Sequence, residues 1–199
     1  MKKKNLEMLK TFLQVMRNNP DAIERVIPDM YCESYNTIDE LHLLSIGIKK
    51  LIIDIDGTLL PADDINVDEV LKEKILRFKS KNIDICLVSN NKESRVTPVA
   101  EVLDVKYLSE ANKPLPVAFD RAMEILNTTN KDEVAMVGDQ MLSDIKGAKT
   151  YGIYSVLVKP VSKHNNLFTG TSRFLQNRME KHLKKIKKFD KDVYYKNIG

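Results

Sequence analysis

Tryptophan is absent from this sequence, cysteine is scarce, and no long apolar run occurs. Cys32 and Cys86 lie far apart without metal-ligand spacing, which argues against a disulfide framework, so we expect both to be buried as small apolar side chains. No stretch approaches the roughly 18 apolar residues that would span a bilayer. The lysine-rich start lacks the apolar core and cleavage site of a signal peptide. We therefore expect a cytoplasmic chain with one main domain.

The net charge of +4 over 199 residues is unevenly distributed. Residues 1–17 carry a net charge of +4 and residues 173–188 carry +6, whereas residues 18–172 carry −6. A mildly acidic body thus lies between two basic ends, and the ends are the segments expected to meet anionic partners. Binding of single-stranded nucleic acid would favour aromatic side chains in these segments, but they hold only Phe12 and Phe174. Nucleic acid is therefore a disfavoured partner.

Short apolar, largely β-branched runs alternate with helical patterns through the middle of the chain. This alternation is typical of a parallel sheet with helices on both faces, so we expect a three-layer α/β fold. Pro28 and a polar cluster predict a loop over residues 28–39. The expected strands are 51–53, 84–88, 105–108, 133–137 and 154–158, and the expected helices between them are 67–81, 92–103, 116–126 and 142–150.

The two basic ends are both predicted to contain amphipathic helices. The expected division of the chain is a basic N-terminal helix (1–24), a central α/β domain (25–172) and a basic C-terminal helix and tail (173–199). A basic amphipathic helix either lies on an anionic membrane or packs on the body with a solvated basic face. The sequence does not decide between these two arrangements. It therefore also leaves open whether the protein binds peripherally to a membrane.

Asp54 and Asp56 follow the first predicted strand in the pentapeptide DIDGT. Because these two residues are two positions apart at the end of a strand, their side chains project to the same side of the sheet. Two carboxylates this close repel each other unless a cation lies between them or one is protonated. The alternative is an ordinary Asp-Gly turn at the end of a strand. Gly57 and Thr58 provide a turn in either case.

Polar residues also follow the later strands. Ser89 ends the run DICLVS, Lys113 lies in the tripeptide NKP, and Asp139 and Asp144 belong to GDQMLSD. In open α/β sheets, ligands bind outside the carboxyl ends of the strands, so Asp54, Asp56, Ser89 and Asp139, which directly follow apolar runs, are expected to share one site.

Taken in order, these four segments resemble the four motifs of the haloacid dehalogenase (HAD) superfamily. The resemblance implies a Rossmann-like sheet and a phosphomonoester hydrolase. It implies that Asp54 is the nucleophile and that Asp56 is the general acid and base. A halide leaving group needs no protonation whereas an alkoxide does, so the presence of Asp56 favours a phosphatase over a dehalogenase. The remaining residues implied to bind the substrate phosphate are Ser89, Asn90 and Lys113.

The same resemblance implies Mg²⁺ as the cofactor. Its expected protein ligands are Asp54, the backbone carbonyl of Asp56 and Asp139, because Mg²⁺ prefers carboxylate, carbonyl and water oxygens. Asp144 is expected to orient Lys113 or a metal-bound water, the alternative being a favourable charge at a helix N-terminus.

Two spacings predict that no cap domain covers the site. Only 25 residues separate Thr58 from Asp84, and 23 separate Ser89 from Lys113. The fold is therefore expected to be capless, with a site open to substrates too bulky to be enclosed, such as protein, nucleic acid or membrane lipid.

At finer scale, residues 25–185 resemble the YqeG family, whose eukaryotic relatives are phosphatidylglycerophosphate phosphatases. The matching segments include GIKKLIIDIDGTLLP, LVSNNKESRV and VAMVGDQMLSDIKGAKTYGIYSVLVKPV. Gly57 departs from the usual Asn, and Asn112 from a frequent Lys. Two alternatives stay open: a cytosolic phosphatase of a small phosphorylated metabolite, and a nucleic-acid- or ribosome-binding protein on a HAD scaffold. Arg95, within LVSNNKESRV, could reach the substrate phosphate, but we expect it rather to face solvent.

Overall fold

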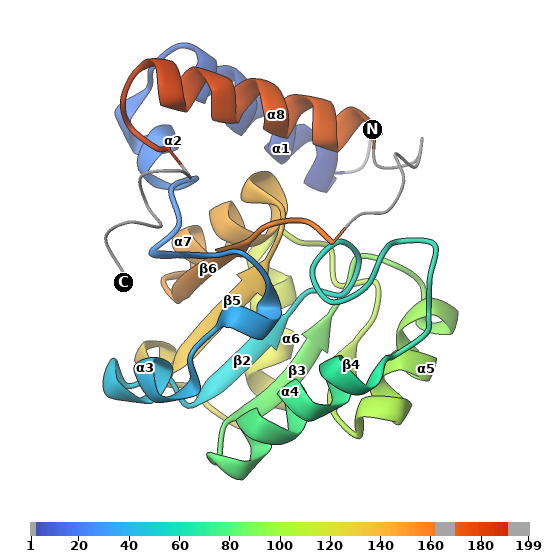
Figure 1. The fold of residues 1–199 in the computed structure, drawn as a ribbon. Helices are drawn as coiled ribbons and strands as arrows, with labels where there is room; N and C mark the ends of the chain where they lie inside the picture. The colour runs from blue at the N-terminus through green and yellow to red at the C-terminus, as the bar shows by residue number, and fades with distance from the viewer. Residues whose placement is uncertain (1–2, 162–169, 191–199) are drawn as a thin grey trace.

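The fold is built around one six-stranded parallel sheet (Figure 1). The computed structural model describes residues 3–161 and 170–190. The strand order is β1-β6-β5-β2-β3-β4, and every neighbouring pair is parallel. The strands are β1 (Met30–Cys32), β2 (Lys50–Ile53), β3 (Asp84–Val88), β4 (Lys106–Leu108), β5 (Val134–Gly138) and β6 (Tyr154–Val158).

Helices cover both faces of this sheet, which confirms the three-layer α/β architecture. On one face, α3 (Glu40–Ser45), α4 (Glu69–Ser80) and α5 (Glu93–Leu103) bury apolar side chains against the strands. On the other face, α6 (Pro116–Ile125) and α7 (Lys146–Tyr151) do the same. Because both faces are covered, the central strands β2 and β5 are apolar on both sides, as parallel strands usually are.

The register of the sheet brings the ends of its central strands to one level. Ile53 pairs with Val137 of β5 and with Leu87 of β3. The residues that follow these strands therefore emerge at the same carboxyl edge. Between Thr58 and Asp84 the described chain forms only α4, and between Ser89 and Lys113 it forms only α5 and β4, so neither segment holds an inserted domain.

The loop expected over residues 28–39 is wrong in part. Met30–Cys32 forms β1, which pairs with β6 at the edge of the sheet, and Tyr35–Thr37 forms a short 3-10 helix, η1. The Asp29 carboxylate fixes the start of β1 by accepting hydrogen bonds from the amide and hydroxyl of Ser155. A strand of three residues is too short to show periodicity, so this long-range pairing leaves no local signal.

A third hydrophobic cluster joins the two ends of the chain to the sheet. Helices α1 (Lys3–Met16), α2 (Pro20–Glu24) and α8 (Gly170–Lys185) lie beyond the β6 side of the sheet, with α1 beside α8 (Figure 1). Their buried side chains meet those of η3 (Met141–Ile145), a π-helical turn that precedes α7. The single helix expected over 142–150 is thus divided in two. The expected tail beyond Asp190 lies outside the described residues.

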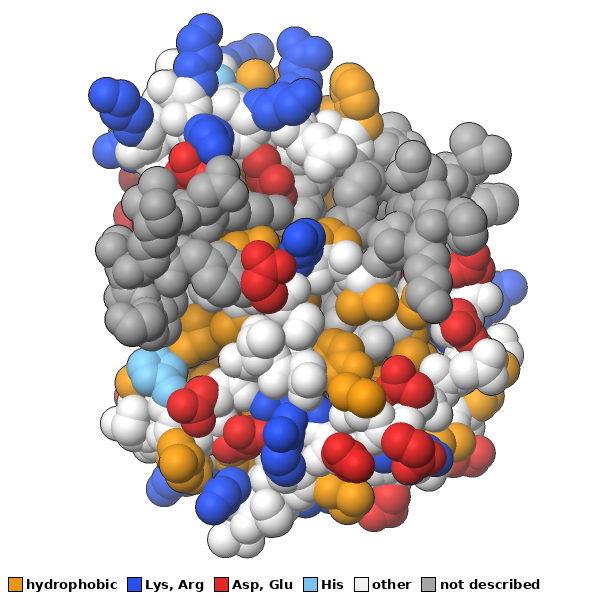
Figure 2. Space-filling view, viewed as in Figure 1, with side chains coloured by type: hydrophobic (Ala, Val, Ile, Leu, Met, Phe, Trp, Pro, Cys, Tyr) orange, Lys and Arg blue, Asp and Glu red, His pale blue; other side chains and the backbone are white. Residues whose placement is uncertain are grey.

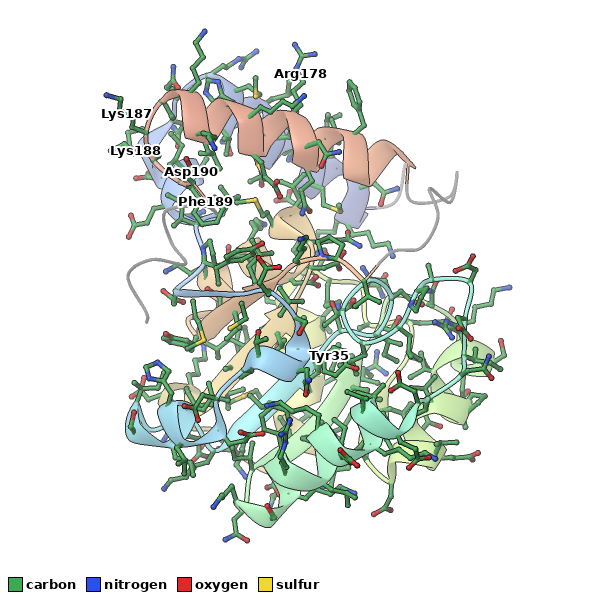
Figure 3. All side chains as sticks on the ribbon, viewed as in Figure 1. Tyr35, Arg178, Lys187, Lys188, Phe189 and Asp190 are labelled. Carbon is green, nitrogen blue, oxygen red and sulfur yellow. The ribbon has the colours of Figure 1, made fainter. Side chains whose placement is uncertain are left out.

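The basic C-terminal helix packs on the body and also exposes charge. Figure 2 shows Lys and Arg side chains gathered over the end formed by α1 and α8. Arg178 points away from the body, whereas Phe189, 4% exposed, lies edge-on to Tyr31 with 6.4 Å between ring centroids (Figure 3). In the described part of the chain, no helix has the length and apolar character needed to cross a membrane.

Candidate active site

The residues that follow β2, β3 and β5 converge at the carboxyl edge of the sheet. Asp54 continues the ladder beyond β2, since its amide donates to the Val137 carbonyl at 2.9 Å. The Ser89 amide likewise donates to the Leu108 carbonyl at 3.0 Å. Asp139 follows the last residue of β5. The backbone of the sheet therefore fixes the positions from which these side chains project.

The DIDGT segment turns back sharply over this edge. The Ile55 carbonyl accepts hydrogen bonds from the amides of Thr58, Leu59 and Leu60 at 3.2, 2.9 and 3.0 Å. Gly57 has φ +93°, and a Cβ atom there would lie 2.6 Å from Oδ2 of Asp139. Glycine suits the left-handed backbone at this position, and a larger side chain would have to displace the Asp139 carboxylate.

Three buried carboxylates form an acidic cluster under this turn. Asp54, Asp139 and Asp144 each place one oxygen within 4.8 Å of the others. The Thr58 hydroxyl lies between two of them, 3.1 Å from Oδ2 of Asp54 and 3.4 Å from Oδ1 of Asp139. Three carboxylates this close repel one another strongly in a buried site unless cations compensate their charge.

Lys113 provides part of that compensation. Its ammonium, 1% exposed, lies 2.6 Å from Oδ1 of Asp54 and 2.9 Å from Oδ1 of Asp144, and it donates to the Val88 carbonyl at 2.8 Å. Burial acts to lower the pKa of Lys113, but the charges of Asp144 and Asp54 outweigh it and raise that pKa. The ammonium is therefore charged at neutral pH.

The cluster nevertheless retains excess negative charge. Burial raises the pKa of Asp54 to about 8; Lys113 opposes this shift, while Asp144 and Asp139 add to it. Burial is the largest cause of the raised pKa, and the two neighbouring carboxylates add to it because they repel the charged form of Asp54. Three carboxylates against the Lys113 ammonium form an oxygen-rich, net-negative donor set, which fits a hard divalent cation.

Asn90 places Lys113 through its backbone. Its Nδ2 donates to the Lys113 carbonyl at 3.1 Å, and its Oδ1 accepts from the Lys113 amide at 2.7 Å. Both ends of the Asn90 amide are therefore engaged by the NKP segment. Its expected contact with a substrate phosphate stays a prediction.

Asp56 points to a different set of partners from Asp54. Oδ1 of Asp56 lies 2.9 Å from Nε and 2.7 Å from Nη2 of Arg95, and Oδ2 accepts from Asn91 at 2.8 Å and from Ser89 at 3.3 Å. Arg95 also donates to the Pro61 carbonyl at 3.0 Å. Its side chain is 14% exposed, so the expectation of a solvent-facing Arg95 is wrong.

Asp144 lies in the π-helical turn η3 and faces Lys113. Its carboxylate also accepts from the Gln140 amide at 3.1 Å and the Ser143 hydroxyl at 3.0 Å. A Cβ atom on Gly138 would collide with the Asp144 side chain, which explains the glycine before Asp139. Asp144 forms a 2.9 Å ion pair with Lys113, and its expected role in orienting that lysine stays a prediction.

Sequence reasoning missed Asn91, which donates to Asp56, and it missed Gln176, which contacts this edge from α8. Gln176 of α8 donates to the Asp139 carbonyl at 2.8 Å and accepts from the Met141 amide at 3.1 Å. It lies 37 residues beyond Asp139 in a helix whose pattern indicated only an amphipathic surface, and no local signal marks it.

Comparisons with known proteins agree with this geometry. Residues 51–113 match the family of haloacid dehalogenase-like hydrolases, and residues 110–164 match a HAD-hydrolase-like family. The chain is 31% identical over 159 residues to a Bacillus subtilis (strain 168) protein named "Probable phosphatase YqeG", covering 80% of this chain and 92% of that protein.

Solved structures with a similar arrangement are more distant in sequence. An uncharacterized protein from Listeria monocytogenes serotype 4b is 17% identical, with a TM-score of 0.47, covering 60% of this chain and 85% of that one. The 3-deoxy-D-manno-octulosonate 8-phosphate phosphatase from Moraxella catarrhalis, in complex with magnesium, phosphate and KDO, is 14% identical, with a TM-score of 0.43. That match covers 74% of this chain and 92% of the solved chain.

Proposed function

Because this chain belongs to the YqeG family of haloacid dehalogenase-like phosphatases, we propose that it hydrolyses phosphatidylglycerophosphate with Asp54 as the nucleophile. The observation that carries the proposal is the convergence of Asp54, Asp56, Ser89, Lys113 and Asp139 at one edge of the sheet. Phosphoryl transfer needs an in-line nucleophile and positive charge around the phosphoryl oxygens, and these residues supply both.

The reaction divides into two steps at Asp54. Its carboxylate attacks phosphorus, the bond to the ester oxygen breaks, and Asp56 gives its proton to the leaving oxygen. In the second step Asp56 takes a proton from water, which attacks the phosphorus of the aspartyl-phosphate and releases phosphate and free Asp54. Ser89 donates a hydrogen bond to the phosphoryl group, and the Lys113 ammonium beside Asp54 offsets its charge.

The net-negative donor set is assigned to Mg²⁺. Asp54, the backbone carbonyl of Asp56 and Asp139 would hold it, while Asp144 keeps Lys113 in place through their 2.9 Å ion pair. The ion would supply positive charge to the phosphoryl oxygens as their charge rises in the transition state.

The lack of an inserted cap domain after β2 and β3 in the described part of the chain supports a bulky substrate. A phosphate ester on a membrane surface would not have to pass beneath a cap to reach Asp54. The exposed basic side chains of α8 and the segment after it offer attraction to the anionic lipids around such a substrate; these are Arg178, Lys181, Lys184, Lys185, Lys187 and Lys188.

The deciding experiment is phosphate release from phosphatidylglycerophosphate in mixed micelles, compared with a panel of soluble phosphate esters. The Asp54→Asn variant serves as the control for contaminating phosphatase. We expect kcat/KM for the lipid to exceed that for every soluble ester. A higher kcat/KM for a small sugar phosphate would assign the protein to soluble metabolism instead, and no activity above the Asp54→Asn level would refute the proposal.

A further inference from the structure

Gln176 links the C-terminal helix to the backbone that follows β5. Its side chain is only 3% exposed, although it lies on a helix with a strongly basic outer face. Nε2 donates to the Asp139 carbonyl at 2.8 Å and to the Glu180 carboxylate at 3.1 Å, and Oε1 accepts from the Met141 amide at 3.1 Å. Both ends of the amide are therefore used, which fixes its orientation.

The two backbone groups that Gln176 contacts lie on either side of Gln140. The bridge thus holds the short turn in which the chain leaves β5 and enters η3. The Asp139 side chain, which is 0% exposed, projects from this turn toward the Thr58 hydroxyl. A change in the Asp139 peptide would move its carboxylate relative to Asp54.

Apolar packing alone does not explain a glutamine at this position. Met179 and Leu183 of α8 already pack into the cluster that contains Met141, Leu142 and Ile145. An amide removed from water costs free energy unless its hydrogen bonds are replaced, so an apolar residue would serve a purely space-filling role better. What Gln176 adds is the pair of directional contacts to the Asp139–Met141 backbone.

We propose that Gln176 is a positioning residue that holds Asp139 in the geometry needed to bind a divalent cation. The inference rests on the metal-binding role of Asp139 in the proposed function. Helix α8 would then hold the metal site in place as well as present a basic surface. Partners that orient metal ligands typically change metal affinity or activity by about 10- to 100-fold when they are removed.

The test compares Gln176→Leu with Asn177→Leu, the same change at the exposed neighbouring amide. Mg²⁺ affinity is measured by calorimetric titration of the full chain, well below the unfolding temperature of each variant. We expect Gln176→Leu to weaken Mg²⁺ binding by about 10- to 100-fold and to raise the Mg²⁺ concentration for half-maximal activity in parallel. Asn177→Leu should leave both unchanged. Hydrogen exchange at the Met141 amide should accelerate only in Gln176→Leu.

Met179→Ala controls for simple loss of stability. It removes apolar packing of α8 while keeping the bridge, so it should lower the unfolding temperature without changing Mg²⁺ affinity. If Gln176→Leu does not fold, Gln176→Glu replaces it, since that variant keeps the acceptor for Met141 but places a carboxylate oxygen against the Asp139 carbonyl.

The outcomes separate this inference from the proposed function. Unchanged Mg²⁺ affinity in the Gln176 variant, or an equal loss in Met179→Ala, would reduce Gln176 to a structural residue and overturn the inference alone. Absence of Mg²⁺ binding by the wild-type chain would overturn the metal site itself. Normal Mg²⁺ effects without turnover of any phosphate ester would count against the proposed reaction only.

Discussion

At the scale of single residues, the two oxygens of Asp54 have different partners. Lys113 contacts Oδ1 and the Thr58 hydroxyl donates to Oδ2. Burial raises the pKa of Asp54 to about 8, which means that burying its charge is unfavourable in the absence of a metal. The carboxylate proposed as the nucleophile is thus also the one whose pKa burial raises, and strongly perturbed pKa values are common at catalytic sites.

Replacing Asp54 by Asn should abolish phosphatase activity while preserving the fold. The amide has nearly the same volume but cannot form the phosphorylated intermediate, and Lys113 keeps its ion pair with Asp144. We expect kcat to fall by at least about 1000-fold, the scale seen when a nucleophile is lost. Phosphate release measures the loss, and circular dichroism should show an unfolding temperature no lower than that of the wild type. Turnover at the wild-type level would rule out Asp54 as the nucleophile.

Arg95 offers a second residue-scale prediction. Arg95 binds Oδ1 of Asp56 and the Pro61 carbonyl, so Arg95→Met should release the carboxylate that we propose transfers protons. A positioned general acid–base group contributes about 100- to 10,000-fold, so partial loss of its orientation should lower kcat by about 10- to 100-fold. Arg77→Met, at an arginine whose side chain is 56% exposed, is the matched control and should stay near wild type. Equal activities in the two variants would contradict a role for Arg95 at the site.

The sequence predicts some of these residues well and others not at all. Asp54, Ser89 and Asp139 directly follow apolar strands, so the rule that parallel strands end at one edge was enough to bring them together. Arg95 and Gln176 reach the site from helices, and their contacts depend on side-chain direction and on packing between distant segments. Neither quantity has a local pattern in the sequence.

At the scale of elements, the prediction failed where local structure depends on distant partners. The edge strand β1 exists because it pairs with β6 and because Asp29 binds Ser155, 126 residues away. The helix expected over 142–150 begins instead as the π-helical turn η3, where the Asp144 carboxylate binds the Gln140 amide and Lys113. π-helical turns are often associated with functional sites, and this one carries a residue of the acidic cluster.

Helix α8 should contribute to the stability of the whole domain. Met179 is fully buried against residues of α1 and η3, so Met179→Ala should lower the free energy of unfolding by about 2–5 kcal/mol. Urea denaturation measures this change. Phe174→Ala, at a side chain that is 61% exposed on the same helix, is the control and should have little effect. A loss below about 0.5 kcal/mol for Met179→Ala would mean that α8 is not part of the folded unit.

At the scale of the whole molecule, the basic segment 173–188 and the candidate active site are far apart along the chain but lie in contact in the folded structure. The basic residues 173–188 belong largely to α8, and α8 also contacts the turn that bears Asp139. Its apolar side supports the sheet, while its basic side faces outward, as Figure 2 shows at the α1–α8 end. Packing on the body and attraction to an anionic surface are therefore compatible properties of one helix.

The exposed lysines of α8 should strengthen binding to anionic membranes. Lys181 and Lys185 are four residues apart on one face of the helix, and each basic residue near an anionic membrane contributes about 1 kcal/mol. Changing both to Gln should weaken partition onto anionic vesicles by roughly 30-fold, with little change in turnover of a soluble ester. The attraction should also weaken steeply with salt, because it is screened beyond about 8 Å at physiological ionic strength.

Lys81 and Lys106, two exposed lysines at the opposite edge of the sheet, provide the matched control. Changing both to Gln gives the same net charge but leaves α8 intact. Vesicle co-sedimentation at several salt concentrations compares the two double variants. If both lose the same affinity, net charge alone governs binding and α8 has no specific role. If neither loses affinity, the membrane part of the proposed function fails, while a larger loss for the α8 variant identifies α8 as the membrane-facing surface.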